Sequence, residues 1–355
     1  MNDIRLFYAF FFIITSCPQC ILAFSYAVEN GTPVDWSQQD NSIRLESSNN
    51  ANMYCTATLV SGRYALTAAH CLDGNGIDRI SSVSNDITQI SQQLMHPNYV
   101  ENGGFSTEDI GIVKLEHQID YHNIQFLSID KHTVGEKLTI AGFGETIETL
   151  NRADFTFSHY YPNPDDPDNP FVMYADMVND SHTTGGDSGS AWVNKNSEII
   201  AIHKGSTHYV SGERKTYGTD IKAVKDFITD NIDGWHYPTL VDANGRTTIT
   251  VQSLHRDDVS DDAYVDGDVT LIPEDSTCMT DGLIQPFGKC TYVIESAGGE
   301  GELYLSDSEI IHINKPIKNT GGDGGNNNSD NDDTGGSMGF WSFLLLGIAV
   351  LRRKR

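Results

Sequence analysis

Basic residues are scarce in this chain. Its 355 residues include 23 Lys and Arg against 49 Asp and Glu, which gives a formal net charge of −26 at pH 7. A surface of this sign repels phosphates and gains nothing from counterion release. The composition therefore argues against nucleic acid as a partner and is consistent with a highly soluble protein.

Helical periodicity is also scarce. Most apolar runs are short and separated by Gly, Asn and Asp, and the chain contains 32 Gly. This pattern predicts strands and turns in an all-β protein. Only the segment Asp220–Ile232 has apolar residues at helical spacing, which predicts one helix there.

Cysteine is limited to six residues. Two of them lie within residues 1–27, where an early Arg5, a long apolar run and the ending Ser-Tyr-Ala are typical of a secretory signal peptide. Removal of that peptide would leave four cysteines in an oxidising compartment. Two local disulfides are the economical assignment, Cys55 with Cys71 and Cys278 with Cys290.

Two other interpretations of the N-terminus stay open. The apolar run could be a membrane anchor, although Pro18 and its polar neighbours interrupt it. The sequence ITSC, which ends at Cys17, has the shape of a lipoprotein cleavage box, but apolar residues continue well past it. The signal peptide accounts for more of the segment than either alternative.

The C-terminus has a sorting-signal pattern. Residues 319–337 are too rich in Gly, Asn and Asp to pack and predict a linker. The apolar segment within 338–355 is shorter than the roughly 20 residues that cross a bilayer, and it ends in RRKR. Together with Gly335-Gly336 it resembles the GlyGly-CTERM tail of Gram-negative secreted proteins. The resemblance implies transient membrane association, cleavage by a rhombosortase, and type II secretion to the medium or cell surface; a short tail anchor is the alternative.

Three segments contain the residue types of nucleophilic catalysis. A serine hydroxyl needs an imidazole to take its proton, and the imidazole needs a carboxylate to orient it. The segment ALTAAHC supplies His70, EDIGIVKL supplies Asp109 at the start of a strand, and TTGGDSGSAW supplies Ser188 on a glycine-rich turn. The backbone amides of Gly186 and Ser188 could then bind the oxyanion of a tetrahedral intermediate.

In this order the three segments resemble the trypsin-like (chymotrypsin-fold) serine peptidases. The motifs HPNY and IAGFGET and the single helix extend the resemblance over residues 28–235. It implies two six-stranded Greek-key barrels with a cleft between them, protein or peptide substrates, and no cofactor or catalytic metal. By this resemblance His70 is the general base, Asp109 its orienting carboxylate and Ser188 the nucleophile, and Gly186 and Ser188 form the oxyanion hole.

The chain departs from the usual family pattern at two places. GDSGSA stands where the family usually has GDSGGP, and Thr184 stands where a cysteine is common. One frequent disulfide is therefore missing, and the loops around the specificity pocket are expected to be less constrained.

The sequence VENGTP, which starts at Val28, resembles the mature N-terminus of the family. The resemblance implies that the α-amine of Val28 pairs with Asp187. Because Ala27 rather than Arg or Lys precedes Val28, no tryptic activation site exists there. We hypothesise that signal peptidase cuts after Ala27 and releases the activating terminus directly; cleavage by another protease in another register is the alternative.

The specificity pocket does not match trypsin. Trypsin specificity needs an Asp six residues before the nucleophile, and His182 stands there. The segment is more similar to bacterial glutamyl endopeptidases, in which a Thr five residues before the serine and a His fifteen after it bind a carboxylate. Thr183 and His203 have these spacings and predict a preference for Glu at P1, the residue whose carbonyl is attacked. Two reservations stay open: that family has Asn at the position of Asp187, and His203 could be a structural strand residue.

Residues 236–318 contain four strand candidates and predict a small acidic β-sandwich domain of Ig-like size. Its acidic run could hold a divalent cation, although such runs are more often solvated loops. The acidic residues concerned are Asp257, Asp258, Asp261, Asp262, Asp266 and Asp268. A rival to the enzyme hypothesis is an inactive homologue that serves as a surface binding module, with this domain supplying contacts. The intact catalytic motifs argue against that rival.

Overall fold

The computed structural model describes residues 28–84, 87–100, 108–146, 149–162 and 170–316. The predicted signal peptide with its lipoprotein-box alternative, the linker and the C-terminal sorting tail lie outside these residues. Within the described part of the chain, no helix has both the length and the apolarity needed to cross a membrane.

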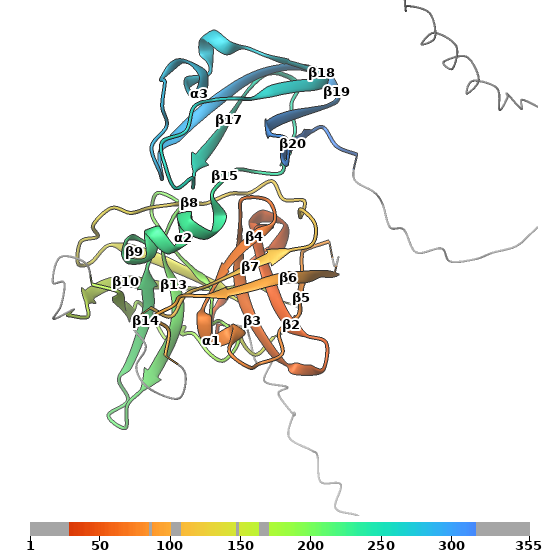
Figure 1. Ribbon diagram of the computed structural model, residues 1–355. Helices are drawn as coiled ribbons and strands as arrows, with labels where there is room; N and C mark the ends of the chain where they lie inside the picture. Colours follow the sequence, from red (N-terminus) through yellow and green to blue (C-terminus); the bar gives the residue numbers. More distant parts are fainter. Residues whose placement is uncertain (1–27, 85–86, 101–107, 147–148, 163–169, 317–355) are drawn as a thin grey trace, which may run out of the picture. The chain divides into compact units, whose positions relative to one another are not determined.

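Six antiparallel strands close into a first barrel in the order β2-β3-β4-β7-β6-β5 (Figure 1). The strands are β2 (Ser42–Ser47), β3 (Asn50–Val60), β4 (Tyr64–Thr67), β5 (Arg79–Ser81), β6 (Ile87–Met95) and β7 (Gly111–Leu115). Alternate residues of β2 such as Ile43 and Leu45 are fully buried, since successive side chains of a strand point to opposite faces. They pack against Leu59, Ile80 and Val113 in one core.

A second barrel follows. Its strands are β9 (Lys137–Gly142), β10 (Asn151–Tyr160), β11 (Val172–Met177), β12 (Ala191–Asn194), β13 (Glu198–His208) and β14 (Arg214–Asp220). They pair in the order β10-β11-β14-β13-β12-β9, and the pairing of β9 with β10 closes the ring. Phe155, Phe157 and Trp192 fill the core. Strand β1 (Thr32–Pro33) pairs with β10, and β8 (Phe126–Leu127) with β13.

The predicted helix is confirmed in shorter form. The structure has a 3-10 turn η2 (Lys222–Val224) followed by α2 (Lys225–Ile232), whereas Asp220 is the last residue of β14. The Asp220 carboxylate accepts a hydrogen bond from the Lys222 amide at 2.9 Å, so this residue stops the strand and opens the turn. The other helical segments are η1 (Trp36–Gln39), α1 (Ala69–Leu72), η3 (Pro273–Asp275) and α3 (Thr277–Thr280).

The C-terminal residues form one curled antiparallel sheet in the order β15-β17-β19-β20-β16, with β18 on β19. Its strands are β15 (Trp235–His236), β16 (Leu240–Val241), β17 (Gly245–Ser253), β18 (Tyr264–Leu271), β19 (Lys289–Ser306) and β20 (Glu309–Ile313). Strand β16 joins β20 in parallel and is the exception to the antiparallel pairing. The all-β prediction with two six-stranded barrels and a further β unit is thus confirmed.

Strand β19 differs from the sequence prediction. The sequence gives KCTYVIESAG and GELYLSDSEIIHINK as two separate strand candidates, but the structure continues from the first into the second as one strand of 18 residues and places the break before β20. Its first half pairs with β17 and its second half with β20, while β18 follows both halves. Gly298 has a φ of 96°, which allows a bend without interrupting the strand.

Both predicted disulfides are present, Cys55–Cys71 and Cys278–Cys290. The first joins β3 to α1 in the first barrel. The second joins α3 to the start of β19 in the C-terminal sheet. Each closes a short stretch of chain, as the spacing predicts.

Buried polar side chains attach the C-terminal sheet to the segment between the barrels. The Gln252 side chain accepts from the Leu127 amide at 2.9 Å and donates to the carbonyls of Leu127 and Phe287. His236 is fully buried, its Nδ1 accepts from the Ser61 amide at 3.3 Å, and its Nε2 lies 2.9 Å from the Gln125 carbonyl. Burial lowers the pKa of His236 to about 4, so its ring is neutral.

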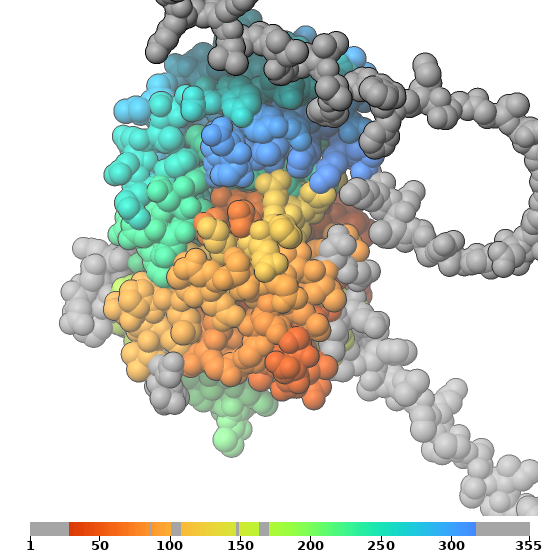
Figure 2. Space-filling view, turned by 45° about the vertical axis from the view of Figure 1, so that its right-hand side comes forward, coloured from red at the N-terminus to blue at the C-terminus, as the bar shows by residue number. Residues whose placement is uncertain are grey.

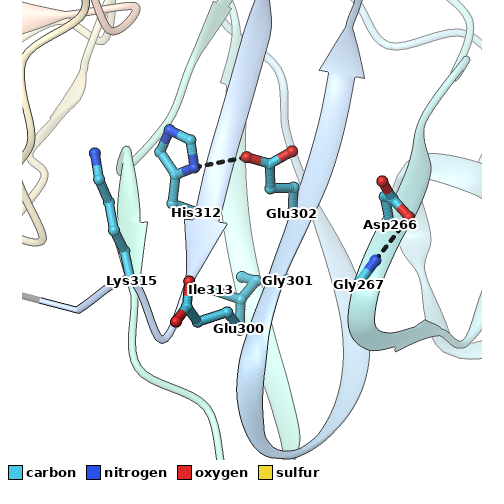
Figure 3. Close-up of a pocket in the computed structure, with 8 residues that line it drawn as sticks. All are labelled: Asp266, Gly267, Glu300, Gly301, Glu302, His312, Ile313 and Lys315. Atoms are coloured by element: carbon cyan, nitrogen blue, oxygen red, sulfur yellow. Dashed lines mark hydrogen bonds and ion pairs between the residues drawn. The ribbon is translucent and has the colours of Figure 1, made fainter. Parts of the chain in front are cut away.

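A cavity of about 220 Å³ opens on the C-terminal sheet. Figure 3 shows its lining residues, Asp266, Gly267, Glu300, Gly301, Glu302, His312, Ile313 and Lys315. His312 Nδ1 and Glu302 Oε1 form an ion pair at 3.1 Å across it. In the part of the chain that the structure describes, no group of three or more His, Cys, Asp or Glu side chains is arranged to hold a metal ion.

Candidate active site

His70 and Asp109 meet because their strands are neighbours. Strand β4 pairs with β7, with Thr67 opposite Gly111, so α1 after β4 lies beside the segment before β7 that contains Asp109. Asp109 Oδ1 accepts from the His70 amide at 2.9 Å, and Asp109 Oδ2 lies 2.7 Å from His70 Nδ1. A buried carboxylate beside Nδ1 keeps the proton on that nitrogen and leaves Nε2 as an acceptor.

The turn that carries Ser188 requires glycine on both sides. Gly186 has a φ of 102° and Gly189 a φ of 88°, a region that favours glycine. A side chain at Gly186 would collide with the ring of Tyr54, and one at Gly189 with the Thr56 carbonyl. The GDSG pattern therefore follows from crowding as well as from backbone conformation.

The main chain of Ser188 is fixed beside the His70 segment. Its carbonyl accepts from the Thr56 amide at 2.9 Å and lies 3.7 Å from Cys71 Sγ. Among the described residues, no hydrogen bond joins the Ser188 hydroxyl to His70. Such contacts are often long in substrate-free enzymes and shorten when substrate binds.

Two backbone amides next to Ser188 are available to a ligand. Within the described residues, the N–H groups of Gly186 and Ser188 have no acceptor. The Gly185 carbonyl, which belongs to the same peptide as the Gly186 N–H, accepts from the Glu145 amide at 3.1 Å. The Gly186 carbonyl accepts from Thr56 Oγ1 at 2.9 Å. Thr56 thus holds the peptide between Gly186 and Asp187, and this contact was missed by the sequence interpretation, although Thr56 directly follows Cys55.

Val28 and Asp187, which the resemblance pairs, are in contact. The Asp187 carboxylate is fully buried and accepts from the amides of Thr184 at 2.7 Å and Gly144 at 2.8 Å. The Val28 amide also donates to it. Burial raises the pKa of Asp187 to about 7, against these hydrogen bonds. Val28 itself is completely buried, with a φ of 49°.

Two hydroxyls near Asp187 lack partners. The Ser190 hydroxyl lies against Gly142 and the Thr184 hydroxyl against Gly144, in both cases beside the carboxylate. Both are buried without a hydrogen bond among the described residues. The polar surroundings of Asp187 are therefore incomplete in the uncut chain.

Thr183, which the sequence interpretation assigned to the specificity pocket, lies beside β13. It is buried, and its carbonyl accepts from Ser206 Oγ at 3.2 Å, which brings it beside β13. Thr216 of β14 is directly opposite Ser206 in the register. The hydroxyls of Thr183 and Thr216 are both buried without a partner. Thr216 and Ser206 were missed from the sequence because only strand pairing brings them to Thr183.

His203 is fully buried in β13 next to Trp192. Its Nδ1 accepts from Trp192 Nε1 at 3.3 Å, so its proton is on Nε2. Burial, and then the nearby His70, lower the pKa of His203 to about 3. The ring is therefore neutral and offers one N–H donor.

His182 is bound by the N-terminal segment. Its Nε2 lies 2.9 Å from Glu29 Oε2, and its Nδ1 lies 3.0 Å from the Asp180 carbonyl. A backbone bridge also joins Glu29 to His182. Both ring nitrogens thus face oxygen acceptors supplied by the chain itself, which limits the part that this side chain can play toward a substrate.

Known proteins resemble this chain chiefly over the two barrels. The protein-family model described as Trypsin matches residues 29–228. An uncharacterized peptidase of Corynebacterium glutamicum (strain R) is 27% identical over 234 residues, which cover 63% of this chain and 73% of that peptidase. The CLIP domain-containing serine protease B10 of Anopheles gambiae is 28% identical over 126 residues, 26% of this chain and 34% of that protease.

Among solved structures, the Vibrio cholerae VesB protease has a TM-score of 0.47 and 17% identity, and the match covers 80% of this chain and 98% of that one. Neuropsin of mouse brain has a TM-score of 0.48 and 21% identity, with 57% of this chain and 99% of that one covered. Because the family match spans more than half of the chain, this protein belongs to the trypsin family and is a serine peptidase.

Proposed function

We propose that this protein is a secreted serine endopeptidase that cleaves peptide bonds through an acyl-enzyme. The observation that carries the proposal is the pairing of His70 with Asp109 through two contacts, beside a glycine turn with two free amides. These are the parts that nucleophilic acyl transfer needs: a base, its orienting carboxylate and an oxyanion site.

The reaction follows from this geometry. Ser188 Oγ attacks the substrate carbonyl carbon while His70 Nε2 takes the hydroxyl proton. The oxyanion receives hydrogen bonds from the Gly186 and Ser188 amides. The intermediate collapses when His70 returns the proton to the leaving amine, and the acyl group stays on Ser188. Water, deprotonated by His70, then hydrolyses the ester and restores the enzyme.

Activation by a free Val28 amine is the second part of the proposal. In the uncut chain Val28 has a φ of 49°, which is strained for a β-branched residue. Cleavage after Ala27 removes the peptide that imposes this φ and replaces an amide with an ammonium beside a buried carboxylate. N-terminal sequencing of secreted protein tests this step, and a mature chain that starts anywhere but Val28 contradicts it.

An acidic P1 preference is supported by three donors, which lie on β13, on β14 and in the segment before Ser188. A Glu carboxylate could accept from the unpaired hydroxyls of Thr183 and Thr216 and from the Nε2 proton of neutral His203. His182 replaces the acid that would attract Arg or Lys. Cleavage profiling with a peptide library tests the preference, and a preference for Arg, Lys or Phe would assign the chain to another P1 class.

An inactive homologue that acts as a binding module is the rival function. It is disfavoured because the His70–Asp109 pair and the free amides form a complete set of catalytic parts beside Ser188. A fluorophosphonate probe separates the two functions: it should label the mature protein and should not label Ser188→Ala. Absence of labelling of the native protein would favour the binding module.

The export route remains part of the proposal. Signal peptidase would remove residues 1–27, and a rhombosortase would act near Gly335-Gly336 during type II secretion, after a transient membrane association of 338–355. The two disulfides support passage through an oxidising compartment. The intact mass of protein collected from the medium gives both ends of the mature chain, and retention of 338–355 would contradict the sorting step.

A further inference from the structure

His70 lies in a helix of a single turn, α1, which runs from Ala69 to Leu72. In a longer helix the amide of residue 74 would donate to the His70 carbonyl, because helical bonds join residues four positions apart. The helix ends at Leu72, so this carbonyl is one of the groups that a helix terminus leaves without a partner. Another part of the chain has to supply the donor.

The side chain of Asn75 supplies it. Its Nδ2 donates a hydrogen bond to the His70 carbonyl at 2.7 Å. The His70 amide donates to Asp109 Oδ1 at 2.9 Å, and Asp109 Oδ2 lies 2.7 Å from Nδ1 of the His70 ring. Two contacts from Asp109 and one from Asn75 therefore hold the proposed base, and the proposed mechanism leaves the contact from Asn75 without a role.

Two glycines turn the chain on either side of Asn75. Gly74 has a φ of 65° and Gly76 a φ of 66°, a region of backbone conformation that favours glycine. A Cβ at Gly74 would meet no atom within 4 Å, so conformation and not crowding accounts for the glycine there. These turns allow the Asn75 amide to reach a residue five positions earlier.

The loop that carries Asn75 is anchored at both ends. Before the loop, Cys71 of α1 forms the disulfide with Cys55 of β3. After the loop, Ile77 is 3% exposed and belongs to the core of the first barrel. This barrel forms the orange face in the foreground of Figure 2. Since both ends are fixed, the half-buried Asn75 side chain can hold the carbonyl in one place.

The contact from Asn75 acts in a different direction from the contacts of Asp109. In a helix the amide and the carbonyl of one residue point in opposite directions along the axis. The two contacts to Asp109 still permit a rotation of His70 about the line that joins them. A third contact at the carbonyl prevents this rotation, which would displace Nε2 of the ring.

We propose that Asn75 is a positioning residue that holds His70 so that its Nε2 is directed toward the Ser188 hydroxyl. The inference rests on the proposed function, in which Nε2 takes the proton of that hydroxyl. Proton transfer needs a separation of about 2.6 to 3.2 Å between the heavy atoms, and a displacement of about 1 Å can cost about 100-fold in rate. Asn75 acts through His70 alone, so its loss should lower kcat and leave KM nearly unchanged.

The test measures kcat and KM of the mature enzyme with the best substrate from library profiling, at a temperature at which calorimetry shows each variant to be folded. Asn75→Ala removes the donor, and we expect kcat to fall about tenfold while KM stays within about twofold. Asn75→Asp keeps the shape of the side chain but places an oxygen against the His70 carbonyl. It should lower kcat at least as much, which separates loss of the donor from loss of packing.

Asn231→Ala is the matched control. The Asn231 side chain donates to the Phe227 carbonyl at 2.7 Å, which is the same kind of bond, but in α2. Figure 1 shows α2 away from α1 and next to the C-terminal sheet. Asn231→Ala should lower the thermal midpoint about as much as Asn75→Ala and should keep the native kcat.

Three results would overturn the positioning role of Asn75. They are a native kcat in both Asn75 variants, a rise in KM with kcat unchanged, and an equal loss of kcat in Asn231→Ala. Failure of the fluorophosphonate to label Ser188 in the native enzyme would instead overturn the proposed function. The two failures are therefore distinguishable, because the labelling experiment uses the native chain and the positioning experiment uses the variants.

Discussion

Two histidines with the same burial have opposite surroundings. His236, at the attachment of the C-terminal sheet, has partners for both ring nitrogens, and nearby Gln252 uses every polar atom of its amide. His203, in the second barrel, lies among the segments that carry unpaired hydroxyls. Those buried hydroxyls belong to Thr183, Thr184, Ser190 and Thr216. Within the described residues 236–316, no buried side-chain atom is left unpaired.

The comparison distinguishes the buried polar groups that hold the C-terminal sheet in place from those that lie near the proposed active site. An unpaired buried polar group costs about 1 to 3 kcal/mol, so a water molecule, an ion or a ligand is an expected partner for such a group. At the C-terminal sheet the partners are already present, and the polar groups fix its position. Near Ser188 the expected partners are a substrate carboxylate at Thr183 and Thr216, and the Val28 ammonium at Thr184 and Ser190.

The largest effect is expected from a substitution of Ser188, the proposed nucleophile. Ser188→Ala should lower kcat by a factor of about 10⁶, because the residual rate comes from the oxyanion site and substrate binding alone. The thermal midpoint should change little, since the hydroxyl makes no hydrogen bond to the described residues. Peptide hydrolysis and calorimetry measure the two quantities, and appreciable residual cleavage would remove Ser188 from its assigned role.

A smaller effect is expected at His203. His203→Ala leaves a substrate carboxylate short of one donor, at a cost of about 2 to 4 kcal/mol, or roughly 30- to 1000-fold in kcat/KM for Glu substrates. Labelling of Ser188 by a small fluorophosphonate should persist. An equal loss for every P1 residue would mean that His203 is structural, like His236, and would leave the catalytic residues unaffected.

The Asp187 site should show a pH dependence that differs before and after cleavage. In the uncut chain the folded-state pKa of Asp187 is about 7 against an ordinary 3.8, so the folded chain binds the extra proton. The contribution of Asp187 to stability should be greatest below about pH 4 and should fall, by a few kcal/mol in total, as the pH rises to about 7. Denaturation of a chain that begins at Ser25, compared with one that begins at Val28, measures this. The same fall in both chains would contradict an ammonium–carboxylate pair.

The smallest effects come from a matched pair of buried threonines. Thr239 donates to the Ile119 carbonyl at 2.8 Å and accepts from the Tyr121 amide at 2.8 Å, whereas the Thr216 hydroxyl has no partner. Thr239→Val should therefore lower the free energy of unfolding by about 1 to 3 kcal/mol without changing P1 preference. Thr216→Val should be neutral or stabilising by up to about 1 kcal/mol and should slow Glu cleavage. Equal changes in the free energy of unfolding of the two variants would contradict the difference between the paired Thr239 hydroxyl and the unpaired Thr216 hydroxyl.

Much of the site could be predicted from local sequence. His70, Asp109 and Ser188 stand in short motifs whose neighbouring residues indicate the local structure. A disulfide cysteine follows His70, an apolar strand follows Asp109, and the glycines that a crowded turn requires flank Ser188. The disulfides were predictable because each joins cysteines that are close along the chain. Thr216 and Ser206 could not be found in this way, since nothing around them marks a pocket.

The fold shows the same division. Alternation and turn residues predicted strands and a separate C-terminal β unit, and the resemblance to the trypsin-like peptidases implied the two barrels. The glycines near Gly298 misled the prediction of β19, because a glycine in a strand can bend it as well as end it, and only the partners on both edges decide which. His182 is another example: its position suggested the base of the pocket, but Glu29 of the N-terminal segment binds it.

The sequence by itself determined the class of fold, the proposed catalytic residue types, their order and the two disulfides, because these depend on residues within a few positions of one another. The tertiary structure alone decided which hydroxyls face Thr183 and which buried histidine is satisfied. Those facts depend on the register between strands that are distant in the chain. A shift of one residue in that register would turn each of these side chains to the other face of its sheet.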